Sequence, residues 1–134
     1  MPTYPKSEKL KSRNTIDLMF KSGKSVSKYP LRLTFLRGNV DEGQLLKMGV
    51  SVSKKYFKKA VDRNYFKRVL RETYRLNKHL LVDRLEEPYC FMLFYQSKDR
   101  LTYEEINLKT IQLFEKFHLQ LQETVAKQKI DPGI

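Results

Sequence analysis

The stretch AVDRNYFKRVLRETYR, residues 60–75, decides the fold of this chain, because apolar and cationic side chains recur in it with the period of a helix. On a helical wheel of about 100° per residue, extended to about residue 81, one half carries the apolar residues that we expect in the core. These residues are Val61, Tyr65, Phe66, Val69, Leu70, Leu76 and Leu80. The opposite half carries cations, with Asn64 and Tyr74 among them: Arg63, Lys67, Arg68, Arg71, Arg75 and Lys78. The pattern predicts a helix whose apolar half packs on a sheet and whose cationic half faces solvent.

Positive charge is concentrated around this helix. The 134 residues carry a net charge of +12, from 27 Lys and Arg against 15 Asp and Glu. Between Lys54 and Lys78 there are ten cations and only two acids, Asp62 and Glu72, which fall on the apolar half of the wheel or its edges. We therefore expect no acid within the cationic half, whereas an ordinary solvated face mixes both signs. The imbalance predicts a surface that binds a polyanion.

RNA is the polyanion that this pattern favours. Membrane binding would need a free apolar face, which the sheet covers, and the apolar run YCFMLFY, residues 89–95, is shorter than the roughly 20 residues of a membrane span. A DNA-reading helix-turn-helix would need a short helix before Ala60, where the sequence has an alternating strand and a basic loop. We expect no membrane partner and no DNA partner.

The remaining periodicities predict an α+β fold, with a mixed sheet packed by helices in the order helix, strands, helix, strand, helix. The expected elements are a helix at 12–23, strands at 30–36 and 45–55, the helix from 60 to about 81, a strand at 89–95 and a helix from about 102 to beyond 121. The strand at 89–95 is apolar on both faces, so it should be central in the sheet. The expected organisation is a basic flexible arm at 1–10, a single RNA-binding domain at 11–126 and a polar tail at 127–134.

Capping residues mark the ends of the two outer helices. The first helix has Ser12 or Asn14 as its N-cap and Gly23 as a left-handed stop. The last helix begins at a capping box formed by Thr102 and Glu105.

The first two strands each have an apolar face and a second, different face. In the first strand the apolar face is formed by Leu31, Leu33 and Phe35. Its other face is formed by Arg32, Thr34 and Leu36. In the second strand the apolar face is formed by Met48, Val50 and Val52. Its other face is formed by Gly49, Ser51 and Ser53. The small polar face of the second strand is either open to a ligand or simply solvated.

The sequence shows no pattern typical of catalysis or metal binding in the protein itself. The single Cys90 lies in an apolar run, which predicts a buried, unreactive thiol and suits a reducing cytoplasm. His79 and His118 have no carboxylate or Cys at ligand spacing, and Glu86 and Glu87 lie in a turn as solvated charges. We therefore expect no catalytic residue and no bound metal in this chain.

The segments SVSKK, KKAVDRN, KR and RETYR, within residues 51–75, resemble the signature of the bacterial ribonuclease P protein subunit. LKSRNTIDLMFKSGKS, residues 10–25, is similar to the opening helix and glycine of that family, and SKDRLTYEEI, residues 97–106, resembles the segment before its last helix. The resemblance runs in order over about residues 8–120.

This resemblance implies a split βαβ arrangement of unusual crossover hand, like domain 2 of ribosomal protein S5. It also implies a cytoplasmic protein subunit that binds a catalytic RNA and the 5′ leader of precursor tRNA, and so promotes endonucleolytic 5′ maturation of tRNA. Hydrolysis is then expected in the RNA subunit, with Mg²⁺ held through that RNA and no cofactor bound by the protein.

The resemblance also implies two groups of site residues. The positions that match the RNA-binding signature are Lys54, Lys55, Arg63, Asn64, Lys67, Arg68 and Arg71, to which the cationic half of the helix adds Arg75. The leader-binding cleft is expected to include Phe20, Arg32, Thr34, Ser51 and Ser53. An exposed Phe20 could stack on an unpaired base.

Five residues depart from the family pattern. Tyr65 stands where a third basic residue is usual, and Phe57 with Lys58 stands where a glycine is often found. Thr34 and Ile16 stand where the family has aromatic residues. The residues alone leave open a structural RNA-binding protein of ribosomal or chaperone type, with no link to catalysis.

Overall fold

The computed structural model describes residues 4–130, with side chains described up to residue 123. It confirms the α+β fold and the predicted order of helix, strands, helix, strand and helix. The elements are η1 (Lys6–Glu8), α1 (Arg13–Ser22), β1 (Lys24–Lys28), β2 (Leu31–Arg37), β3 (Leu46–Val52), α2 (Ala60–Val82), β4 (Tyr89–Tyr95) and α3 (Tyr103–Ile130).

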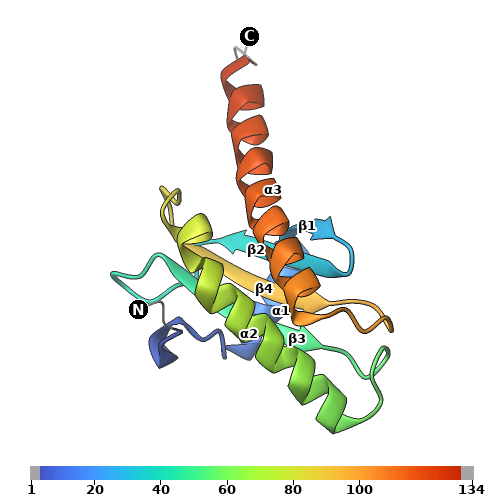
Figure 1. Cartoon of the computed structure of the whole chain (residues 1–134). Coiled ribbons are helices and arrows are strands. Elements are labelled where there is room, and N and C mark those ends of the chain that lie inside the picture. Colours follow the sequence, from blue (N-terminus) through green and yellow to red (C-terminus); the bar gives the residue numbers. More distant parts are fainter. Residues whose placement is uncertain (1–3, 131–134) are drawn as a thin grey trace.

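The sheet is mixed, with strand order β1-β2-β4-β3. β4 pairs antiparallel with β2 and parallel with β3, so it is central, as predicted. Figure 1 shows α2 and α3 across one face of the sheet and α1 on the opposite face. The βαβ unit consists of β3, α2 and β4. Its two strands are hydrogen-bonded neighbours, whereas the expected split arrangement has another strand between them.

β1 is the element that the sequence analysis missed. Its sequence KSVSK has a single buried side chain, Val26, and therefore no apolar periodicity to predict a strand. It pairs only with β2, at the edge of the sheet. The Lys116 ammonium on α3 donates to the Ser27 carbonyl at 2.8 Å, which ties this edge strand to the last helix.

The capping predictions are confirmed at both helix starts and wrong at Gly23. Thr102 and Glu105 exchange two hydrogen bonds, of 3.0 and 3.2 Å, and the Ser12 hydroxyl accepts from the Thr15 amide at 3.3 Å. Gly23 is extended, with φ −73° and ψ 156°, because the chain leaves α1 directly into β1. Glycine is needed there for space, since a Cβ would lie 2.4 Å from the Met19 carbonyl oxygen.

The buried face of α2 differs from the predicted one. Val61, Tyr65 and Leu76 were expected in the core but are 70%, 39% and 38% exposed. The buried residues are Phe66, Val69, Leu70, Thr73, Tyr74, Asn77 and Leu81. The helix is therefore rotated about its axis relative to the expectation, so that the polar residues Thr73 and Asn77 face the interior.

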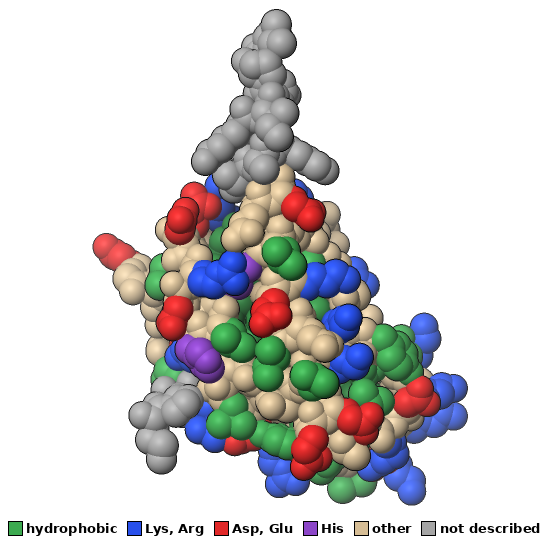
Figure 2. Space-filling view, turned by 45° about the horizontal axis from the view of Figure 1, so that its top comes forward, with side chains coloured by type: hydrophobic (Ala, Val, Ile, Leu, Met, Phe, Trp, Pro, Cys, Tyr) green, Lys and Arg blue, Asp and Glu red, His purple; other side chains and the backbone are tan. Residues whose placement is uncertain are grey.

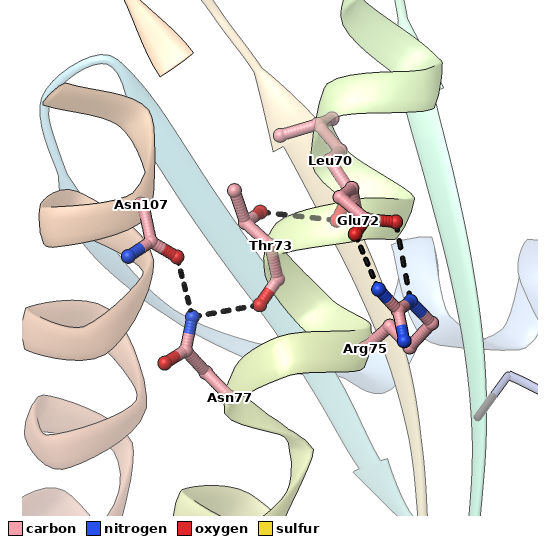
Figure 3. A network of polar contacts seen from close by, with 6 residues as sticks. All are labelled: Leu70, Glu72, Thr73, Arg75, Asn77 and Asn107. Atoms are coloured by element: carbon pink, nitrogen blue, oxygen red, sulfur yellow. Dashed lines mark hydrogen bonds and ion pairs between the residues drawn. The ribbon is translucent and has the colours of Figure 1, made fainter. Parts of the chain in front are cut away.

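Polar partners on α3 explain this rotation. The Asn77 side-chain amide donates to Asn107 Oδ1 at 2.7 Å and to the Thr73 carbonyl at 2.8 Å, as Figure 3 shows. The Thr110 hydroxyl donates to Thr73 Oγ1 at 3.1 Å. Because these groups satisfy one another, polar side chains can be buried where α2 and α3 cross.

Residues 4–10 pack against the body of the protein, which differs from the expected flexible arm. Lys9 forms an isolated parallel bridge with Met48 of β3, and the Leu10 amide donates to the Met48 carbonyl at 3.0 Å. Residues 1–3 of the expected arm lie outside the described residues. At the other end, residues 127–130 of the expected tail continue α3, and residues 131–134 lie outside the described residues.

The N-terminal segment also buries Tyr74, which the wheel had placed in solvent. The Tyr74 hydroxyl donates to Glu8 Oε1 at 3.0 Å, and the Tyr4 ring contacts the Tyr74 ring edge-on at 5.1 Å. Burial raises the pKa of Tyr4 to about 12 and raises that of Tyr74 above its ordinary value. Residues 4–8 thus cover the C-terminal half of α2.

The isolated titratable groups include Cys90, which is buried as the sequence predicted, and His118, which is also buried. Cys90 is fully buried beside the Asn39 carbonyl, and burial raises the pKa of its thiol to about 11. A His118 ring nitrogen lies 3.0 Å from the Leu81 carbonyl, and burial lowers the pKa of this side chain. Within residues 4–130, no helix has the length and hydropathy needed to cross a membrane.

Candidate nucleic-acid interface

The N-terminal half of α2 carries cations that face solvent. Arg68 and Arg71 are exposed and Lys67 is half-buried. Spacings of three and four residues place these side chains on one side of the helix. In the described part of the chain none of the three forms an ion pair, so their charges are free for an external partner.

The C-terminal half of α2 is different, because its cations are paired with acids. The Arg75 guanidinium donates to Glu72, from Nε at 3.1 Å, and this bond holds the pKa of the Glu72 carboxyl below its ordinary value (Figure 3). Lys78 forms an ion pair with Glu8 from the N-terminal segment. The prediction that no acid enters the cationic half is therefore wrong here, and the free charge lies nearer the start of α2.

The loop between β3 and α2 continues the free charge. We call residues 53–59 the basic loop, because it carries four exposed lysines, which are Lys54, Lys55, Lys58 and Lys59. The basic loop together with Lys67, Arg68 and Arg71 is the cationic surface. Figure 2 shows Lys and Arg side chains gathered at the lower right of the molecule, toward the N-terminal end of α2. Asn64 of the predicted signature is exposed on the same stretch of helix.

Arg63, also predicted to contact RNA, is directed toward the basic loop. Its Nη1 donates to the carbonyl oxygens of Phe57 at 3.0 Å and Lys58 at 2.7 Å. The side chain is only partly exposed. Arg63 is therefore hydrogen-bonded to the backbone of the basic loop, whereas Arg68 and Arg71 face solvent.

The sheet face opposite α2 and α3 holds the predicted leader-binding residues. Arg32, Phe94 and Ser51 are aligned in register across β2, β4 and β3. The Phe20 ring, 67% exposed at the end of α1, lies 6.1 Å from the Phe94 ring, and Arg32 is exposed. We call Phe20, Arg32, Ser51 and Phe94 the aromatic sheet face. Ser51 lies two residues before the basic loop, so this face adjoins the cationic surface.

Two of the predicted cleft residues lie outside this group. Thr34 is 7% exposed, in register with Met92 under α1, and offers little surface to a ligand. Ser53 is exposed, but it belongs to the basic loop, where its hydroxyl accepts from the Lys55 amide at 3.0 Å. Phe94 was missed, although its position is readable, because it alternates with the core residue Leu93 along β4.

The positions that depart from the family pattern have clear places. Phe57 is 6% exposed and stacks on Phe66 with ring centroids 4.6 Å apart, so it anchors the basic loop in the core. Tyr65 is exposed, with its ring edge-on to Phe66 at 5.0 Å. Ile16 is half-buried and packs against the small apolar cluster under α1.

Among the described residues no group of three or more His, Cys, Asp or Glu is placed to hold a metal ion.

Comparisons with known proteins agree with this geometry. The family model described as Ribonuclease P matches residues 4–118. The ribonuclease P protein component of Porphyromonas gingivalis is 45% identical over 98 residues, which cover 72% of each chain. That of Dictyoglomus turgidum is 34% identical over 83 residues, covering 62% of this chain and 66% of the relative.

Solved structures share the fold. The RNase P protein from Thermotoga maritima is 25% identical, with a TM-score of 0.66 over 81% of this chain and 96% of that one. The RNase P protein of Staphylococcus aureus has the same TM-score of 0.66 at 21% identity, over 81% of this chain and 93% of that one, which shows a shared fold. With a family match over residues 4–118 and a relative at 45% identity, the chain belongs to the ribonuclease P protein family.

Proposed function

We propose that this protein binds the RNA subunit of ribonuclease P through its cationic surface and the 5′ leader of precursor tRNA on its aromatic sheet face. In this way it promotes endonucleolytic removal of the leader. The observation that carries the proposal is that the two surfaces are adjacent along the chain, since Ser51 of the sheet face lies two residues before the basic loop. Two RNA segments bound side by side would be held in a fixed relation to each other.

The cationic surface suits a folded RNA. The free side chains on α2 and in the basic loop are positively charged, and all but the half-buried Lys67 are exposed, so they can neutralise phosphates without breaking internal ion pairs. Folded RNA is recognised largely by shape and phosphate contacts, which asks for such a surface rather than for a base-reading helix.

The aromatic sheet face suits a single strand. Stacking of an unpaired base on an aromatic ring contributes about 1–3 kcal/mol and depends little on sequence. Phe20 offers an exposed ring beside Phe94, and Arg32 offers a nearby positive charge for the backbone. A leader bound there would be recognised as a flexible strand with few base preferences.

We place hydrolysis in the RNA subunit, with Mg²⁺ held through that RNA and no cofactor bound by the protein. The side chains of both surfaces supply phosphate neutralisation and stacking, which position RNA segments for a reaction. On this proposal the protein acts in the cytoplasm.

Reconstitution tests the proposed function. A bacterial ribonuclease P RNA made by transcription is combined with this protein at low Mg²⁺, and cleavage of two precursor tRNAs is followed, one with a long leader and one with a single leader nucleotide. We expect the protein to accelerate cleavage over RNA alone, and to do so more for the long leader. No gain with either precursor would contradict the proposal and favour a structural RNA-binding protein.

A further inference from the structure

The basic loop has a defined backbone despite its charge. The amides of Tyr56 and Phe57 both donate to the Ser53 carbonyl, at 3.1 and 3.2 Å, and the Lys55 amide donates to the Ser53 hydroxyl at 3.0 Å. These bonds close a turn at the start of the loop. Four lysines in seven residues repel one another, and this turn opposes the resulting tendency of the loop to open.

One aromatic side chain fixes the middle of the loop. Phe57 stacks on Phe66 of α2 at 4.6 Å with an interplanar angle of 21°, and its ring lies 5.9 Å from Tyr95 of β4. Because Phe57 is buried between exposed lysines, the lysines before and after it are turned outward.

Two guanidinium groups from different elements contact the loop. Arg63 of α2 donates from Nη1 to the Phe57 and Lys58 carbonyls. Arg100, from the segment between β4 and α3, lies over the rings of Phe66 at 5.2 Å and Phe57 at 5.8 Å. Its Nη1 is 3.2 Å from Asp62 Oδ1 in the first turn of α2, which fixes the guanidinium over the rings.

We propose that Arg63 and Arg100 are positioning residues that hold the basic loop in one shape, so that its lysines meet RNA phosphates as a preformed set. This inference rests on the proposed function. A loop that is already ordered loses less conformational entropy on binding, and its charges act together rather than one by one. Arg63 thereby acts on RNA affinity through the loop, whereas Arg68 acts through its own charge.

A double-mutant cycle separates the two roles. Lys58→Ala with Lys59→Ala removes loop charge, and affinity for a bacterial ribonuclease P RNA transcript is measured with and without Arg63→Ala. We expect the loop change to lower affinity about tenfold in the wild-type background and about twofold or less in the Arg63→Ala background. In the matched Arg68→Ala background the loss should stay about tenfold, since no hydrogen bond, ion pair or ring contact joins Arg68 to the loop within the described residues.

The salt dependence of the same binding reaction gives a second readout. Arg63→Ala should reduce the slope of log affinity against log salt by more than two, whereas Arg68→Ala should reduce it by about one. A structural defect without loss of phosphate contacts would leave this slope unchanged. An equal cost of the loop change in all backgrounds, with a slope change of about one for Arg63→Ala, would overturn the inference.

Arg100→Ala keeps the test independent of any folding defect in Arg63→Ala. It removes a contact to the loop that comes from a different element, so the Lys58→Ala, Lys59→Ala change should again lower affinity only about twofold or less. In the background of Lys98→Ala, which replaces an exposed cation of the same segment, the loop change should still lower affinity about tenfold. Thermal unfolding checks that each variant is folded. Failure of the wild-type protein to bind the transcript would count against the proposed function, whereas binding without coupling would count against this inference alone.

Discussion

Replacing Arg68 and Arg71 together with glutamate is expected to weaken binding of a ribonuclease P RNA about 100-fold or more at moderate salt. Both side chains are exposed, and neither forms an ion pair within the described residues. On the proposed function the double change removes two phosphate contacts and adds two repulsions, while no ion pair among the described residues is lost. Filter binding with a labelled RNA transcript measures the effect, and circular dichroism should show an unchanged fold.

A matched pair of substitutions controls for net charge. Arg84→Glu with Lys24→Glu changes the charge by the same amount at two exposed positions outside the cationic surface. We expect this pair to lower affinity no more than about threefold, through the long-range field alone. Equal losses for both pairs would show that net charge, rather than the cationic surface, governs binding.

Phe66→Ala is expected to lower the free energy of unfolding by about 3–5 kcal/mol. Phe66 is 1% exposed, and its ring centroid lies 4.6 Å from both Phe57 and Tyr95. Its removal leaves a cavity between α2, β4 and the basic loop, which cannot close without moving all three. Urea unfolding followed by circular dichroism gives the change in stability.

The neighbouring residue supplies the control for this prediction. Tyr65 carries a ring of similar size but is 39% exposed and contacts Phe66 at its edge. Tyr65→Ala should cost about 1 kcal/mol or less, because most of its surface is already in water. If both substitutions lowered the free energy of unfolding equally, the claim that Phe66 anchors the basic loop through Phe57 would be wrong.

The sequence predicted the ends of α2 well and its buried face less well. Helical periodicity is a local signal, and it placed the helix from Ala60 to about Leu81, against Ala60–Val82 in the structure. The buried face depends on what packs against it. Thr73 and Asn77 are buried because α3 offers them hydrogen-bonding partners, and a pattern based on apolar residues cannot contain that information.

The charge pattern was predicted in outline but not in detail. The pair Glu72–Arg75, three residues apart, was readable from local spacing once the helix was assigned. The pair Glu8–Lys78 joins residues 70 positions apart, and only the packing of the N-terminal segment brings them together. As a result, the cations of α2 that are available to RNA lie in its N-terminal half, next to the basic loop.

Strand alternation predicted which of the candidate cleft residues share one face of the sheet. Arg32 and Ser51 share one face because alternation and register place them there. The depth of each position on that face depends on α1, which covers Thr34 and leaves Phe20 and Phe94 in contact. The coverage of a sheet face by a distant helix cannot be read from the strand itself.

The salt dependence of RNA binding by the wild-type protein is the most direct test of the central claim, that free cations gathered at one end of α2 bind RNA phosphates. If about six phosphates are neutralised, log affinity should fall against log salt with a slope of about −4 to −5. The Arg68→Glu, Arg71→Glu variant should show a clearly shallower slope under the same conditions. A slope near zero for the wild-type protein would contradict the claim.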